Sequence, residues 1–326
     1  MSRALRRRLG QAVVLATVVL LALLARRIAW AEVLTSLRAT PVPRLVSAGA
    51  VALAGHLIYA SFDLLGRRYT QHRLPIHQTV PVTFVCYAFN LNLGAWLGSI
   101  ALRYRLYARL GLPSATITKI LSLSLMTNWL GYFALGGVVF ASGQVHLAGD
   151  WASSAIGLRL LGVGLLAVAL AYLAICGLAR RRVWRVRGRD LALPSGRLAI
   201  GQLILGACNW SAMALVIHVL LARRIEFPTV LGVLLVSAIA GLVSHIPAGL
   251  GVLEAVFLGL LGQRVPSAQL LAALLGYRAL YFLLPLAIAT IVFAGLEIRA
   301  RRTSPPNGGV PIPRPFPAAR PPADNA

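Results

Sequence analysis

Two carboxylates lie inside long apolar stretches of this sequence, where an ionised side chain is costly unless a partner neutralises it. They are Asp63 and Glu254, in a chain with only eight acidic residues. Glu254 follows PAGLG and should begin a half-helix, where free N–H groups and the helix dipole favour negative charge. Arg278 lies too deep in the last apolar run to reach the surface easily and is the natural counter-charge. We expect a Glu254–Arg278 pair, with a purely structural helix lock as the alternative to a functional role.

Arginines follow a glycine-rich break in the apolar run from 80 to 102. Arg105 and Arg109 share a helical face at i, i+4 spacing, whereas Arg103 points elsewhere and can turn inward. A guanidinium at the edge of a membrane cavity suits a lipid phosphate, because it binds two oxygens at once. We expect Arg103 and Arg105 to contact substrate, and for Arg109 we favour a flanking positive charge.

Polar residues also lie beside the predicted chain breaks. Asn90 and Asn92 are amides at membrane depth, and we expect them to face a cavity, although hydrogen bonding between helices explains most such amides. Intramembrane histidines are more often satisfied core groups than proton carriers, and His245, close to a proline kink, is the one that we predict to contact substrate.

Motifs of soluble enzymes are absent from the sequence. HExxH, GxSxG, Walker and paired-carboxylate patterns do not occur, and no polar segment is long enough for a catalytic domain. The three cysteines, Cys86, Cys176 and Cys208, form no CxxC or histidine-linked spacing, so we expect no metal site and no cofactor. Enzymatic activity is therefore not expected. Because the sequence has no ATP-binding motif, transport would use an ion gradient or equilibrate lipid passively.

The composition excludes a water-soluble protein, because 58% of the residues are hydrophobic and only 12% are charged. Of the 40 charged side chains, 32 are basic. The apolar bulk leaves too little polar surface for nucleic acid, so the positive charge predicts anionic lipid as the partner and a fixed membrane orientation.

Apolar runs of spanning length predict an all-α, polytopic membrane protein with about seven or eight transmembrane segments. The runs cover about 10 to 25, 45 to 65, 80 to 102, 117 to 141, 155 to 178, 198 to 222, 228 to 262 and 268 to 296. The first resembles a signal peptide, but Arg26 and Arg27 follow at once, which favours an uncleaved first helix.

Two runs contain residues that break helices near their centres. Pro247, Gly249 and Gly251 interrupt 228 to 262, and Gly94 and Gly98 interrupt 80 to 102. Both runs are therefore predicted to be re-entrant, entering and leaving on the same side of the membrane.

Charge distribution supports this topology. The segment from 180 to 197 is strongly basic and should be cytoplasmic, whereas 142 to 153 contains no arginine and should lie outside. If Arg3–Arg8 and Arg299–Arg302 are also inside, the number of membrane crossings agrees with these sides only when two elements are re-entrant. This topology has the disadvantage that four arginines near the N-terminus lie outside. The rival is a fully spanning 80 to 102 with the N-terminus outside.

A faint internal repeat suggests a paired design. Gly98 precedes Pro113-Ser114-Ala115 by the same spacing that separates Gly251 from Pro266-Ser267-Ala268. Each copy would be a glycine break, a short helix and then a spanning helix. Residues 1–302 are predicted to form the multi-pass domain, and 303–326, rich in proline, a disordered cytoplasmic tail.

The segments CYAFNLNLGAWLGSIALRYRLYARLGLPSATIT, NWLGY and VSHIPAGLGVLEAVF, followed by YRALY, resemble the YbhN-type bacterial inner-membrane members of the lysylphosphatidylglycerol synthase transmembrane-region family. The resemblance extends to about residue 296. It implies that Glu254 and Arg278 are the family's intramembrane acidic and basic residues, and that Arg103 is the arginine after the first break. Many relatives carry a glutamate where this chain has Ser99, which implies a different substrate.

In larger relatives this membrane region is joined to an aminoacyl-transferase domain and flips the aminoacylated lipid. The resemblance therefore implies a lipid flippase that moves an anionic phospholipid or lipid-linked substrate between leaflets of the inner membrane. The alternative is a non-transporting scaffold for a phospholipid-synthesis enzyme, in which the basic segment matters and the buried charges do not. A third reading is an intramembrane lipid-modifying enzyme. Head group, transport direction and oligomeric state have no local signature in the sequence.

Overall fold

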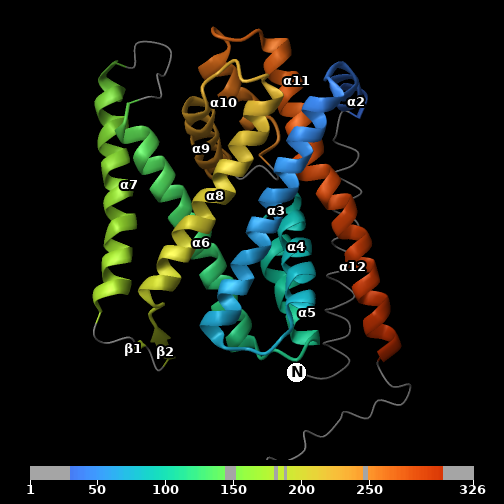
Figure 1. The fold of residues 1–326 in the computed structure, drawn as a ribbon, viewed down its shortest axis with the longest axis vertical. Coiled ribbons are helices and arrows are strands. Elements are labelled where there is room, and N and C mark those ends of the chain that lie inside the picture. Colours follow the sequence, from blue (N-terminus) through green and yellow to red (C-terminus); the bar gives the residue numbers. More distant parts are fainter. Residues whose placement is uncertain (1–29, 144–151, 180–182, 187–188, 245–248, 304–326) are drawn as a thin grey trace, which may run out of the picture.

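The computed structural model describes residues 30–143, 152–179, 183–186, 189–244 and 249–303. They form a helical bundle, whose two ends are called upper and lower as they are drawn in Figure 1. Six helical segments in this part are long and apolar enough to cross a membrane, which confirms the all-α polytopic class. The elements are α2 (Trp30–Ala39), α3 (Val42–Thr70), α4 (Ile76–Leu93), η1 (Ala95–Ala101), α5 (Leu102–Arg109), α6 (Ser114–Ala141), α7 (Ala152–Leu178), β1 (Val183–Val186), β2 (Arg189–Ala192), α8 (Gly196–Leu220), α9 (Phe227–Ser244), α10 (Val252–Leu261), α11 (Ser267–Tyr277), η3 (Arg278–Leu283) and α12 (Leu284–Thr303). The predicted first helix and the proline-rich tail lie outside the described residues.

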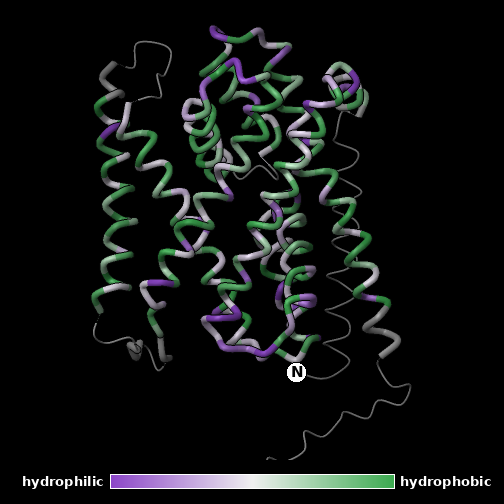
Figure 2. Tube along the Cα trace, viewed as in Figure 1, coloured by the Kyte–Doolittle hydropathy of each residue, from purple (hydrophilic) through white to green (hydrophobic). Residues whose placement is uncertain are grey.

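Hydrophobic residues dominate the helices, and hydrophilic residues gather at the two ends, with a few at mid-height (Figure 2). Helix α3 packs along α8, and α6 packs against both. Helix α7 lies at the edge of the bundle against α6 and α8. These helices form the frame around two shorter, broken elements.

The first broken element is α4 followed by the π-helical segment η1 and by α5. Helix α4 rises from the lower end in Figure 1 and stops near mid-height, and α5 returns to that end. Gly94 makes the turn with φ 80°, a backbone angle that residues with a β-carbon rarely adopt. Gly98 lets the returning arm approach closely, since a β-carbon there would lie 2.2 Å from the backbone nitrogen of Asn90. The predicted hairpin is present, and residues 80–102 do not form one continuous helix. The N-terminus, whose side the rival topology reverses, lies outside the described residues.

The second broken element comes from the opposite end. Helix α9 descends from the upper end and ends at Ser244, and α10 begins at Val252 and returns upward (Figure 1). Gly251 precedes α10 with φ 81°. The predicted pair of half-helices is therefore confirmed, although Pro247 and His245 lie outside the described residues.

The repeat is also visible in the structure. Pro113 precedes α6 and Pro266 precedes α11, and each proline follows the return arm of a hairpin. Proline suits the start of a helix because the first backbone N–H groups have no intrahelical acceptor. The two copies run in opposite directions in Figure 1, as in an inverted repeat.

The basic segment contains a feature that the sequence analysis missed. Strands β1 and β2 form an antiparallel hairpin in which Val183 pairs with Ala192 and Val186 with Arg189. The Tyr69 hydroxyl donates to the Ala192 carbonyl at 2.5 Å, which ties the hairpin to α3. The hairpin and the end of α12 lie at the same lower end of the bundle (Figure 1). The charge pattern predicts that this end is cytoplasmic.

Candidate functional site

A bidentate ion pair joins the second hairpin to the segment that follows α11. Arg278 Nε donates to Glu254 Oε1 at 2.5 Å and Nη2 donates to Oε2 at 3.0 Å. Nη2 also donates to the Gly249 carbonyl at 2.9 Å, so the arginine binds both the carboxylate and the turn before it. Glu254 lies in the first turn of α10, as the sequence predicts. The predicted pair is present and is nearly buried, with side chains 9% and 17% exposed.

Arg278 is also the first residue of η3, a π-helical interruption between α11 and α12. A π turn shifts the i→i+4 ladder to i→i+5 and is frequent at functional sites. The Asn92 amide at the tip of the first hairpin donates to the Phe282 carbonyl in this turn at 3.2 Å and to Ala88 at 2.8 Å. The guanidinium carbon of Arg278 lies 5.8 Å from the centre of the Phe282 ring. One irregular turn therefore contacts both hairpins.

An aromatic cluster lies beside this turn. The hydroxyls of Tyr87 and Tyr281 are 3.2 Å apart, and Tyr87 donates to Asn209 Oδ1 at 3.4 Å. The His56 ring centre lies 4.8 Å from that of Tyr281. His56 Nε2 and the Tyr277 hydroxyl are buried without a hydrogen-bond partner among the described residues. Buried polar atoms normally have partners, so these two atoms are exceptions. They leave unused hydrogen-bonding capacity inside the apolar bundle.

A buried ion pair joins the first hairpin to α3. Arg103 donates from Nε and Nη2 to the two oxygens of Asp63 at 3.1 and 3.0 Å, and both side chains are at most 1% exposed. Its other contacts are Ser99 Oγ at 2.6 Å and Ser124 Oγ at 3.1 Å. Tyr107 donates to Asp63 at 2.8 Å. Arg103 does turn inward as predicted, but these partners hold it, so direct contact with a head group stays a prediction.

Arg105 and Arg109 share one acidic partner. Arg105 donates to the two oxygens of Glu297 at 3.0 and 3.1 Å, and Arg109 pairs with the same carboxylate. The shared partner confirms that the two arginines lie on one face. They tie the first hairpin to α12 near the lower end of the bundle. For Arg105 a role in substrate binding remains a prediction.

The other predicted substrate contacts remain predictions. Asn90 is half-buried next to the Gly94 turn, and its carbonyl accepts the Gly94 N–H at 2.9 Å. Asn92 is buried, and its amide is committed to backbone carbonyls. His245 lies outside the described residues. Within the described ranges no three histidine, cysteine, aspartate or glutamate side chains come together as metal ligands.

The sequence analysis missed two acidic partners of the arginines in the first hairpin, Asp63 and Glu297. Asp63 is an intramembrane acid that needs a cation, and Arg103 is the inward-facing arginine that remains once Arg278 is paired with Glu254. That elimination would have found the pair. Glu297 had no comparable signal, because it lies just beyond the last apolar run, where acids are common. The π turn at Phe282 has no sequence signature either.

Comparisons with known proteins agree with this architecture. Residues 9–289 match the family model of the lysylphosphatidylglycerol synthase TM region. The chain is 45% identical to the inner membrane protein YbhN of Escherichia coli over 88% of its length and 91% of that protein. It is 30% identical to an uncharacterised protein of Synechocystis over 84% of its length and 85% of that protein. A Staphylococcus haemolyticus phosphatidylglycerol lysyltransferase is 39% identical over 93 residues, which is 27% of this chain and 11% of the relative.

Proposed function

Because the chain belongs to the lysylphosphatidylglycerol synthase TM-region family and is a multi-pass inner-membrane protein, we propose that it moves an anionic phospholipid, or a lipid-linked substrate of like charge, between leaflets. The match covers the membrane region, so the proposal concerns lipid movement and not lipid lysylation. The relative named a phosphatidylglycerol lysyltransferase supports an anionic phospholipid as the class of substrate.

The observation that carries the proposal is the contact of both hairpins with η3. Asn92 of the first hairpin and Glu254 of the second bind the same short segment, residues 278–283. Broken helices that enter from opposite sides and meet inside the bilayer are how many transporters expose polar groups at mid-depth. Arg278 is the group that binds phosphate in this scheme, because a guanidinium that leaves a carboxylate can take two phosphate oxygens in the same geometry.

Leaflet exchange tests the proposal. Fluorescent phosphatidylglycerol and a zwitterionic control lipid are placed in liposomes with purified protein, and wild type is compared with Glu254→Gln, Arg278→Ala and the swap Glu254→Arg/Arg278→Glu. The expected result is faster exchange of phosphatidylglycerol, lost in both single variants. The exposed Glu226→Gln is the matched control and should exchange like wild type. Absence of exchange by folded wild type for both lipids would contradict the proposal.

The scaffold function is the second candidate, and the β1–β2 hairpin favours it. This hairpin is an ordered element in the basic segment and is anchored to α3 through Tyr69. A partner enzyme of phospholipid synthesis with an acidic surface would dock there. The scaffold function predicts that neutralising arginines between 180 and 197 abolishes activity in the cell, while Glu254→Gln leaves it intact.

A further inference from the structure

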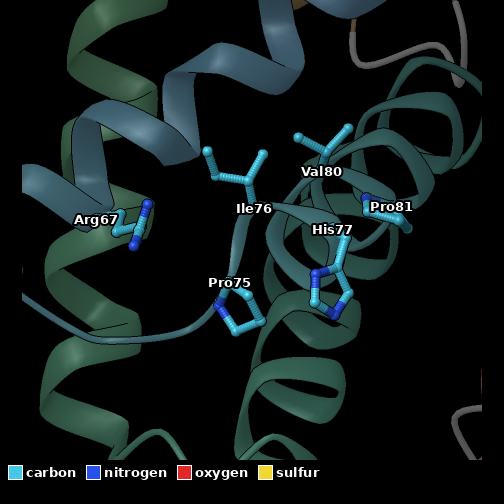
Figure 3. Close-up of a pocket in the computed structure, with 6 residues that line it drawn as sticks. All are labelled: Arg67, Pro75, Ile76, His77, Val80 and Pro81. Carbon is cyan, nitrogen blue, oxygen red and sulfur yellow. The ribbon is translucent and has the colours of Figure 1, made fainter.

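A groove of about 770 Å³ lies between the last turns of α3 and the first turns of α4, at the lower end of the bundle. It is an open surface groove rather than an enclosed cavity. Figure 3 shows Arg67 on one side and the α4 residues opposite. The lining residues are Arg67, Pro75, Ile76, His77, Val80 and Pro81. The groove is distant in sequence from the Glu254–Arg278 ion pair, called the central pair below, and shares no residue with it.

Arg67 supplies the groove with a charge that no acid neutralises. It has no hydrogen-bond or ion-pair partner within the described ranges, and the acid one turn away, Asp63, is held by Arg103 and Tyr107. Burial lowers the pKa of the neighbouring His72, and the positive charge of Arg67 acts in the same direction. Arg67 therefore gives the groove a fixed positive charge, and no carboxylate lines the groove to compete with an anion.

The start of α4 leaves backbone donors and one acceptor without helical partners. The backbone N–H groups of Ile76 and His77 have no acceptor among the described residues, since the first helical amides lie outside the intrahelical ladder. Pro81 has no N–H, so the His77 carbonyl loses its usual donor four residues later. Together with Arg67 and the His77 ring, these groups match a phosphate joined to a hydroxyl-bearing group.

The remaining walls are apolar. Pro75, Ile76, Val80 and Pro81 form them, and the Ile76 side chain is 54% exposed. The groove thus joins a positive end, next to the loop at 71–75, to apolar walls that continue along α4. A glycerophospholipid has the same division between phosphate and acyl chains, whereas a soluble phosphate compound gains nothing from the apolar walls.

We propose that this groove binds one anionic phospholipid, with its phosphate at Arg67 and the start of α4 and its acyl chain along Ile76 and Val80. The groove recognises charge through Arg67 and the polar head group through the freed His77 carbonyl. This site is separate from the central pair, and its occupation does not require that the protein moves lipid.

Counting retained lipids by native mass spectrometry tests this site. The purified full-length protein is released from micelles that contain equal amounts of phosphatidylglycerol and phosphatidylcholine. Wild type should retain phosphatidylglycerol in preference, and Arg67→Gln should reduce this retention about tenfold, as expected for loss of a charge-assisted hydrogen bond. Val80→Trp keeps every charge but fills the groove, and it should reduce retention similarly.

Matched controls separate the groove from general surface charge. Arg68→Gln removes an exposed neighbouring arginine that does not line the groove, and Val168→Trp enlarges a 52% exposed position on α7. Both should retain phosphatidylglycerol within about twofold of wild type. Equal retention by Arg67→Gln and Arg68→Gln would overturn the proposal.

Two further outcomes are decisive. Displacement of the retained lipid by millimolar glycerol phosphate or inorganic phosphate would identify a soluble phosphate compound as the ligand and overturn the lipid assignment. Selective retention through Arg67 in a protein that shows no leaflet exchange would leave this site standing and refute the proposed transport function.

Discussion

Asn92 donates a hydrogen bond from its side-chain amide to the backbone carbonyl of Phe282, 3.2 Å away and 190 positions later in the chain. The contact joins the tip of the first hairpin to the π turn that begins with Arg278. Since Arg278 binds Glu254 of the second hairpin, a displacement of either hairpin strains the same turn. A short irregular segment with two such attachments is a natural place for coupled motion.

Replacing Asn92 with leucine should separate coupling from stability. The variant loses an interhelical hydrogen bond, which lowers the free energy of unfolding by about 1 kcal/mol. Leaflet exchange should fall much further, because the first hairpin no longer holds the π turn. Both are measured on purified protein, with Asn128→Leu on α6 as the control. Exchange at the wild-type rate in Asn92→Leu would contradict the coupling.

Neutralising Asp63 should destabilise the protein strongly. Asp63→Asn leaves the guanidinium of Arg103 buried without its counter-charge, which costs about 3–5 kcal/mol. Thermal unfolding in detergent measures the loss, and Arg73→Gln, at an exposed loop position, should change little. The double variant Asp63→Leu/Arg103→Met should recover much of the stability. If that variant is stable but inactive in exchange, the pair has a functional role as well.

Gly98→Ala should destabilise the first hairpin. The new β-carbon would lie 2.2 Å from the Asn90 backbone nitrogen, so the two arms must separate, at a cost of about 1–3 kcal/mol. Gly157→Ala on α7 is the matched control because, apart from the adjoining backbone of its own helix, no described atom lies within 4 Å of its β-carbon position. A melting temperature shift that is equal in the two variants would argue against close packing at Gly98.

Cysteine labelling in membranes should confirm the path of the chain. With Cys86, Cys176 and Cys208 replaced, Gln71→Cys and Ser114→Cys flank the first hairpin and should react from the same side of the membrane. Gln263→Cys, at the opposite end of the bundle, should react from the other side. By the positive-inside rule, the first two face the cytoplasm. Labelling of residues 71 and 114 from opposite sides would show that residues 80–102 span.

The sequence predicts the helical class and both hairpins because glycine and proline at the centre of an apolar run have few explanations in a membrane. It also predicts the Glu254–Arg278 pair, because charges inside the bilayer are scarce and must find one another. The same reasoning extends to Asp63 and Arg103, because a buried arginine satisfies a protein carboxylate as well as it satisfies a lipid phosphate. Scarcity of charge is therefore a useful guide to internal partners, provided that protein partners are considered before ligands.

Other features depend on information that a single sequence does not hold. The contact of Asn92 with Phe282 joins segments 190 positions apart, and the π turn that receives it arises from packing rather than from local propensity. The β1–β2 hairpin lies in a segment where charge dominated the interpretation, although VWRV and RDLA alternate as short strands do. The groove at Arg67 and His77 requires two helix ends to meet, which only the fold determines.

Each hairpin contributes one charge to a matched pair: Arg103 of the first pairs with Asp63 of α3, and Glu254 of the second pairs with Arg278 of η3. An isolated charge that crosses the whole bilayer exchanges about 2.3 kcal/mol with the field for every 100 mV of membrane potential. A neutral pair that moves as a unit exchanges almost none. While both pairs stay closed, the voltage across the inner membrane therefore does little work on them. A step that separates Arg278 from Glu254 would add its own voltage dependence of leaflet exchange to that of the lipid head group.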